Sequence, residues 1–269
     1  MNRAAIAAIA RRDLTVVVRS RAVILPIVVL PIVFFIVVPA LVALAAGSIT
    51  GDLSQLGELL AVMPETFRRS LTGLSPSAVL IVWGLEYMFA TFFLIVPLMT
   101  SAVIAADSFA GEKERKTLEA RVYTPTSDLE LYAGKLLAPW LAAVVVSTVG
   151  YVVFVVVAST FGGPIVGRLI AVTPHWLMFV LVLAPGVAAL AIGALVQVSA
   201  RVRGFQEAYQ LGGLVVLPLV VLLLSQVTGV LYLDLPAVAV VAGIVWAAAA
   251  GILAVGYRSF RRERVLVQL

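Results

Sequence analysis

The side chains best able to do chemistry in this chain are gathered in one charged segment, residues 107–135, within an otherwise apolar sequence. Residues 112–121 read EKERKTLEAR, so acids are interleaved with lysines and arginines along a string of good helix formers. The segment lies between two apolar runs of membrane-spanning length. A charged run of this kind serves either as a solvated connector or as a docking element for a protein partner.

Residue types needed for several kinds of catalysis are missing from the sequence. It contains no cysteine and one histidine, His175, which excludes disulfides, thiolate sites and histidine-rich metal sites. Gly134-Lys135 is followed by Leu136 and lacks the earlier glycine of a GxxxxGK(S/T) phosphate loop. We therefore predict that the protein is not an enzyme and that it binds neither a metal ion nor ATP directly.

The composition predicts an all-α integral membrane protein with six transmembrane helices in a single domain, residues 1–269. The chain is 62% hydrophobic and 12% charged, whereas soluble domains carry roughly 25% charged residues. Apolar runs of about 18 residues or more form helices across the bilayer, because a helix satisfies its own backbone hydrogen bonds. The predicted spans are Ala22–Ala46, Leu80–Ala106, Leu136–Thr160, Pro174–Ser199, Leu211–Val230 and Ala237–Tyr257.

The distribution of basic residues predicts the orientation. With these six spans, 16 of the 19 lysines and arginines fall in alternate segments on one side, and three fall on the other. Because cytoplasmic segments of membrane proteins are enriched in Lys and Arg, both termini and residues 107–135 are predicted to be cytoplasmic. The same asymmetry accounts for the net charge of +5, so we expect no nucleic-acid partner.

Two segments outside the spans are predicted to form short helices. Residues 1–21 can lie on the membrane as an interfacial helix, with arginines on one side and apolar residues on the other. This helix either only sets the orientation or also touches a cytoplasmic partner. In the external loop, residues 47–79, Asp52 and Pro64 suit the starts of two short helices. That loop either covers an exit from the membrane or is a passive linker.

Glu86 is the one acid well inside an apolar run, in the string VWGLEYMFA. Charged side chains at bilayer depth are costly, which makes such a carboxylate a candidate for a pathway or gate. Its neighbours Trp83 and Tyr87 are typical of the membrane interface. A structural role there, interfacial or protonated, is therefore the alternative interpretation.

The local signals of the charged segment predict its shape. A short charged helix over residues 112–121 is followed by Pro125, which disfavours helical geometry at Thr124. Ser127 and Glu130 then have the spacing of a capping box, which begins a new helix. That helix is predicted to continue into the third span, so force on the charged helix would reach the membrane.

This segment resembles the permeases of type-2 ATP-binding-cassette (ABC) transporters. Many of them carry a pattern close to ExExGTLExLxxTPxSxxExxxGK after their second span. Lys116 stands at the position of the usual glycine, and Arg121-Val122 replaces a common leucine pair. The matching residues here are Glu112, Glu114, Thr117, Leu118, Glu119, Thr124, Pro125, Ser127, Glu130, Gly134 and Lys135.

The resemblance implies a permease subunit of an ATP-driven exporter in the bacterial plasma membrane. Such subunits pair as homodimers or heterodimers and bind two cytoplasmic ATPase subunits, which hold Mg-ATP. Substrate would pass between the two permeases along the second and fifth spans, and the apolar composition favours a hydrophobic or amphipathic cargo. The residues expected to couple to the ATPase are Glu112, Glu114, Arg115, Thr117, Leu118, Glu119, Thr124, Pro125, Ser127 and Glu130.

Two other functions use the same residues differently. A membrane anchor or sensor would recruit a cytoplasmic ATPase through residues 107–135 without transporting anything. An ion channel or secondary transporter gated at Glu86 would carry its substrate without ATP.

Overall fold

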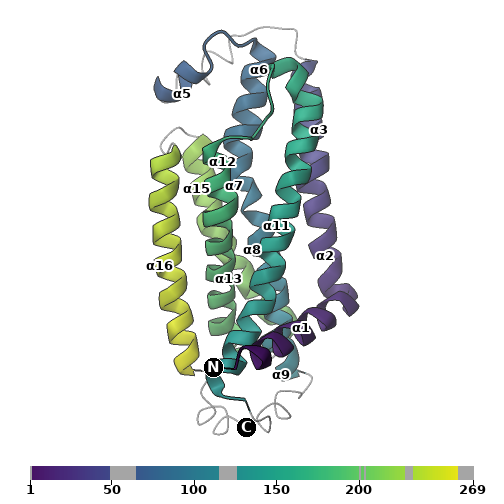
Figure 1. The fold of residues 1–269 in the computed structure, drawn as a ribbon, viewed down its shortest axis with the longest axis vertical. Coiled ribbons are helices and arrows are strands. Elements are labelled where there is room, and N and C mark those ends of the chain that lie inside the picture. The colour runs from purple at the N-terminus through teal and green to yellow at the C-terminus, as the bar shows by residue number, and fades with distance from the viewer. Residues whose placement is uncertain are drawn as a thin grey trace.

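The computed structural model describes residues 2–48, 65–114, 126–199, 201–202, 204–227 and 233–259, and these form one bundle of helices (Figure 1). Six helices are long and apolar enough to cross a membrane, which confirms the predicted all-α membrane fold. They extend over Val23–Gly47, Pro76–Gly111, Asp128–Val166, Pro174–Ser199, Phe205–Gln226 and Leu235–Arg258.

Four of the six spans combine several helical segments. The first contains α2 (Arg21–Ile32), the π-helical η1 (Val33–Val37) and α3 (Val38–Gly47). The second contains α6 (Pro76–Ile81), η2 (Val82–Met88), α7 (Phe89–Phe93), α8 (Ile95–Ala106) and η3 (Asp107–Gly111), and α9 (Glu112–Glu114) follows it. The third is the single helix α11 (Asp128–Val166). The fourth contains α12 (Pro174–Met178), η4 (Phe179–Leu183) and α13 (Ala184–Ser199). The fifth contains α14 (Phe205–Gly212), η5 (Gly213–Val216) and α15 (Leu217–Val227), and the sixth is α16 (Leu235–Ser259).

The second and fourth spans form the centre of the bundle. In each, 78% of the most apolar stretch is buried, against 28% or less in the other four. The peripheral spans turn apolar side chains outward, as α11 does with a stripe spaced three or four residues apart. That spacing places one side of a helix against the lipid. The exposed stripe of α11 is Val145, Val149, Val152 and Val156.

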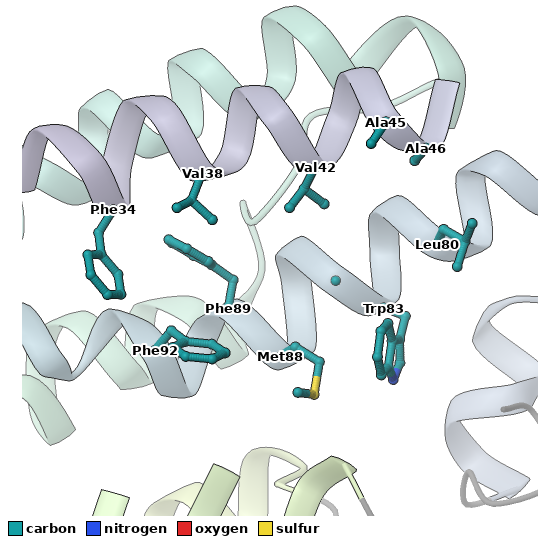
Figure 2. A pocket seen from close by; sticks show the side chains of 11 residues that line it. Phe34, Val38, Val42, Ala45, Ala46, Leu80, Trp83, Met88, Phe89 and Phe92 are labelled. Atoms are coloured by element: carbon teal, nitrogen blue, oxygen red, sulfur yellow. The ribbon is translucent and has the colours of Figure 1, made fainter. Parts of the chain in front are cut away.

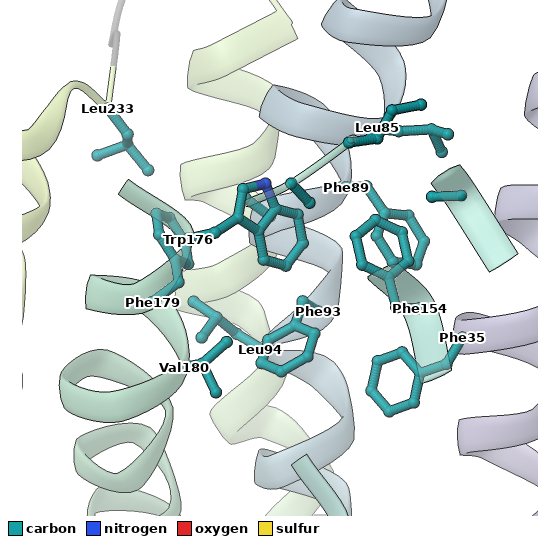
Figure 3. Packing of buried hydrophobic residues seen from close by; sticks show 14 of the residues in the cluster. Phe35, Leu85, Phe89, Phe93, Leu94, Phe154, Trp176, Phe179, Val180 and Leu233 are labelled. Atoms are coloured by element: carbon teal, nitrogen blue, oxygen red, sulfur yellow. The ribbon is translucent and has the colours of Figure 1, made fainter. Parts of the chain in front are cut away.

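Aromatic side chains fill the core between the central spans (Figure 3). The fully buried Trp176 stacks on Phe154 at a centroid distance of 4.8 Å and meets the edge of Phe93 at 5.6 Å. Its indole N–H donates to the backbone carbonyl of Glu86 over 3.1 Å. A buried tryptophan needs such an acceptor, so this bond fixes α12 against the second span at the level of Glu86.

The helix α1 (Arg3–Arg19) lies within residues 1–21, where an interfacial helix is predicted. It crosses one end of the bundle obliquely, beside α9 and the start of α11 (Figure 1). Gly134 allows this crossing, because a Cβ there would lie 2.8 Å from the Cβ of Ile9. The arginines of α1 at positions 11, 12 and 19 are exposed. Placement of α1 on the membrane surface stays a prediction.

The ends of the bundle bear on the predicted loops and topology. The helix α5 (Glu65–Ser70) lies where the second external helix was predicted, and the helix predicted from Asp52 falls outside the described residues. The start of α1, α9 and the end of α16 all lie at the same end of the bundle (Figure 1). This end is the one that the distribution of basic residues predicts to be cytoplasmic, and we call it the loop end.

Candidate functional site: the loop end of the second span

The first part of the site is a buried ion pair between the second and third spans. The side chain of Lys135, on α11, is fully buried, and its Nζ lies 2.6 Å from Oε2 of Glu112, whose side chain is 10% exposed. Nζ also donates to the carbonyl of Ser108 and lies 5.0 Å from the ring centroid of Phe109. Burying an ammonium group is costly unless its donors and its charge are satisfied. These contacts supply the partners, so the pair joins α9 and η3 to α11.

The second part is a link from the same segment to the fifth span. The Oε2 atom of Glu114 accepts a hydrogen bond from the backbone N–H of Phe205 over 2.9 Å. Phe205 is the first residue of α14, and its N-cap is Gly204, which has no side chain to bind the free N–H groups of the first turn. Glu114 therefore supplies the helix cap from a distant part of the chain. Its negative charge also suits the positive end of the helix dipole.

The third part is the start of α11, where the predicted capping box is confirmed. The hydroxyl of Ser127 accepts from the N–H of Glu130 over 3.3 Å, and Oε2 of Glu130 accepts from the N–H of Ser127 over 3.0 Å. The other oxygen of Glu130 accepts from the N–H of Asn2 over 2.5 Å. One carboxylate thus begins α11 and holds the residue that caps α1.

Together these contacts bring four elements to one place: the end of the second span, the starts of the third and fifth spans, and α1. The carboxylates of Glu112, Glu114 and Glu130 all bind groups of this chain. Their assignment as direct ATPase contacts stays a prediction. The other residues of that prediction, Arg115, Thr117, Leu118, Glu119, Thr124 and Pro125, lie outside the described residues.

Three residues of this site, Lys135, Gly204 and Phe205, have no role predicted from the sequence. Lys135 was part of the family pattern but was given no role, although an acid and a lysine at the two ends of one pattern are a signal for pairing. Gly204 and Phe205 were not singled out. Glycine is a common N-cap but brings no side-chain acceptor, so a helix that begins after it leaves its first N–H groups open to an acceptor from elsewhere.

Glu86 lies toward the opposite end of the second span, in a second charged cluster. Its carboxylate receives both terminal nitrogens of Arg168, at 2.6 and 2.7 Å, and the N–H of Ala171 at 2.9 Å. The Glu86 side chain is 7% exposed and that of Arg168 is 47% exposed. The hydrogen bonds to Glu86 raise the pKa of Arg168, which keeps the guanidinium charged.

The segment that carries Arg168 is shaped to meet Glu86. Gly167 ends α11 in the left-handed conformation, with a φ of 79°, which only glycine adopts without strain. Ala171 also has a positive φ, 63°, and its carbonyl accepts from the hydroxyl of Tyr151 over 3.0 Å. This geometry favours the structural interpretation of Glu86. A role in a pathway or gate stays a prediction.

An apolar cavity lies between the first and second spans, with a volume of about 590 Å³. Figure 2 shows Val38 and Val42 pointing from α3 toward Phe89, while Trp83 and Met88 come from η2. None of its lining residues is charged, so the cavity suits a hydrocarbon or aromatic group. It is lined by Phe34, Val38, Val42, Ala45, Ala46, Leu80, Trp83, Gly84, Met88, Phe89 and Phe92.

Within the described ranges, no group of three or more His, Asp or Glu side chains is placed to hold a metal ion. The loop-end contacts join residues 107–135 to the third and fifth spans, because both spans begin there.

Of the comparisons with known proteins, one matches the chain. No curated protein and no solved structure matches the chain. The family model described as ABC-2 family transporter protein matches residues 7–239, which is most of the chain. The match includes all of residues 107–135 and the first five spans. The chain therefore belongs to the ABC-2 transporter family and is a multi-pass membrane subunit of an ABC transporter.

Proposed function

We propose that this subunit works in an exporter of the bacterial plasma membrane, as one of two permeases driven by two cytoplasmic ATPase subunits. The ATPases bind and hydrolyse Mg-ATP, and the permease itself binds none. The observation that carries the proposal is the loop-end site, where Glu112, Glu114 and Glu130 join residues 107–135 to three different helices of the bundle.

The coupling step follows from these contacts. Residues 115–125 lie between α9, which continues the second span, and α11, which forms the third. Force on this segment from an ATPase would reach the third span through the capping box and the ion pair of Glu112 with Lys135. It would reach the fifth span through Glu114. Residues 115–119 are the proposed direct contact with the ATPase, and α1 is the second contact.

We also propose that the cargo is hydrophobic or amphipathic. The cavity between the first and second spans has no charged lining residue and lies within membrane-spanning helices. A small hydrated ion would lose its water there without gaining ligands. A lipophilic molecule would reach this cavity from the bilayer.

Assembly with an ATPase tests the proposed function. The subunit is co-expressed with a candidate ABC ATPase subunit, and complex formation and ATP hydrolysis are measured. Because Glu112 and Glu114 bind within the chain, the informative charge reversals are Arg115→Glu and Glu119→Lys. Both are expected to weaken assembly. Arg258→Glu, which changes an exposed residue at the same end of the bundle, is the matched control.

Normal assembly and normal ATP hydrolysis in both reversal variants would contradict the proposed contact. Complex formation without any ATP-dependent transport would favour the anchor or sensor. Transport that continues after inactivation of the ATPase would favour a channel or secondary transporter.

Filling the cavity tests the proposed cargo. Val42→Trp places a large side chain in the cavity, and ATP-driven accumulation of rhodamine 6G in inverted vesicles is measured. We expect accumulation to fall while assembly with the ATPase persists. Val145→Trp is the control, because Val145 is 58% exposed on α11 and does not line the cavity. Equal accumulation in both variants would remove the cavity from the transport route.

A further inference from the structure

We infer that Glu114 is a positioning residue for the fifth span: its hydrogen bond to α14 is a releasable link that moves this span with residues 107–135. The inference rests on the proposed function, since it requires that an ATPase moves this segment. It names Glu114 as the residue that transmits the movement and α14 as the helix that receives it.

The geometry shows why this link differs from an ordinary helix cap. Most N-caps are local, supplied by the residue just before the helix. Here Glu114 and Phe205 are 91 residues apart, and the carboxylate ends a different span. Gly204 leaves space for it, since a Cβ at this position would lie 2.7 Å from Oε2 of Glu114. The start of α14 is therefore shaped to receive a carboxylate from α9.

The two acids of the ExE pattern make links of different strength. Glu112 and Lys135 are buried, so separating them would remove their mutual attraction while both charges stay away from water. Glu114 is exposed, and its carboxylate can exchange the N–H of Phe205 for water at small cost. The first link is a permanent joint between the second and third spans. The second can open and close within a transport cycle.

The fifth span is the least buried of the six within this chain. Only 11% of its most apolar stretch is buried, the lowest value among the six spans. Farther along, the hydroxyl of Thr91 donates to the side-chain carbonyl of Gln226, and Tyr209 approaches the sulfur of Met99 at 4.0 Å. These contacts hold the fifth span along the second, and Glu114 holds its beginning.

The experiment follows the movement of the fifth span directly. Spin labels are placed at Leu217→Cys on α15 and Val145→Cys on α11, positions that are 57% and 58% exposed. The chain has no cysteine of its own, so labelling before addition of the ATPase is specific. The distance between the labels is measured in nanodiscs, with and without Mg-ATP and vanadate. Hydrogen exchange of the Phe205 amide is followed in the same samples.

Three variants at the link separate coupling from helix capping. Glu114→Ala is expected to abolish the nucleotide-dependent change in distance, with the ATPase still bound, and to speed exchange at Phe205 about fivefold. Glu114→Gln keeps an oxygen that accepts the bond and should retain most of the change. Glu114→Ala with Gly204→Asn supplies a local cap to the second and third residues of the helix, so exchange at Gln206 and Glu207 should slow while the change in distance stays lost.

Asp234 provides a matched control at another helix start. Its carboxylate accepts from the N–H of Ala237 over 2.9 Å and caps α16 locally. Asp234→Ala should speed exchange at Ala237 and leave the nucleotide-dependent change in distance intact. This result would separate the effect of losing any helix cap from the effect of losing the link to α9.

Three outcomes would overturn the inference alone. One is a normal change in distance in Glu114→Ala, and another is recovery of the change by Gly204→Asn, which would reduce Glu114 to a helix cap. The third is loss of ATPase binding in Glu114→Ala, which would make Glu114 a direct contact. A wild-type chain that binds no ATPase would overturn the proposed function together with the inference.

Discussion

The second span holds one carboxylate cluster around Glu86 and another at its loop end, and the two are built differently. Glu86 receives three donors from one short segment, residues 168–171. At the loop end, Glu112 and Glu114 divide their contacts between the third and fifth spans. A single carboxylate bound by one segment fixes that segment. Two carboxylates bound to two spans can hold both and still move one against the other.

Exposure differs between the clusters as well. At Glu86 the acid is buried and its basic partner is half exposed, whereas at the loop end the lysine is completely buried. Loss of the acid therefore has different consequences at the two places. Arg168 can return to water, but Lys135 cannot. Stability should depend more on the pair of Glu112 with Lys135 than on the pair of Glu86 with Arg168.

The largest predicted effect is that of Lys135→Met, which removes the buried positive charge beside the carboxylate of Glu112. We expect a loss of about 3–5 kcal/mol in the free energy of unfolding. The measurement is an unfolding titration in detergent, followed by tryptophan fluorescence. The double variant Lys135→Met with Glu112→Met replaces the pair by apolar groups and should recover most of the loss. A mild effect of the single variant would contradict the comparison of the two clusters.

The next effect is that of Glu86→Ala. Arg168 is rehydrated in this variant, so the main cost is the unpaired N–H of the buried Ala171, about 1–3 kcal/mol. The same titration measures it, and Trp176 lies close enough to report the change. Glu86→Gln keeps an acceptor and should cost less. If Glu86→Gln were stable but inactive in transport, Glu86 would have a role in the pathway as well as in the fold.

A smaller effect is expected from Ser127→Ala, which removes one half of the capping box at the start of α11. The cost should be about 1 kcal/mol, as for other N-cap serines. Circular dichroism during thermal unfolding measures it, with Ser225→Ala as the control within a helix. An effect as large as that of Lys135→Met would mean that the cap, and not the ion pair, holds the third span at the loop end.

The smallest effect is that of Thr91→Val, which removes the hydrogen bond to Gln226 between the two clusters. Hydrogen bonds between membrane helices contribute about 0.6 kcal/mol on average. The spin-label pair used for the fifth span measures the result as a broader distribution of distances. A larger loss of order than in Glu114→Ala would place the main attachment of the fifth span within the membrane and not at its start.

The fold could be predicted from the sequence because the signals for its helices are local. Apolar runs gave all six spans, and Ser127 with Glu130 gave the capping box. The limits of the spans were less accurate. The second helix, Pro76–Gly111, extends beyond the predicted Leu80–Ala106 at both ends, and the third continues to Val166, past the predicted end at Thr160. The π-helical segments could not be predicted from the hydropathy of the sequence.

The partners of Glu86 and Glu114 could not be predicted from the sequence, because they depend on how distant segments pack. Glu86 and Arg168 are 82 residues apart, and Glu114 and Phe205 are 91 residues apart. Each appears locally as a single charge or a helix start. Only the crossing of the second span with the other helices brings them together. The pattern of residues 112–135 predicted where the site lies, but the packing of distant helices determined which residues contact one another there.

The burial of Lys135 also bears on how the chain enters the membrane during synthesis. Glu112 precedes Lys135 by 23 residues, so the ribosome delivers the acid first. A lysine that ends with no exposure to solvent gains least by leaving water before its carboxylate is in place. The second span, once inserted, presents that carboxylate to the third as it arrives. These two spans are thus suited to leave the insertion machinery together, as one hairpin in which Glu112 and Lys135 neutralise each other.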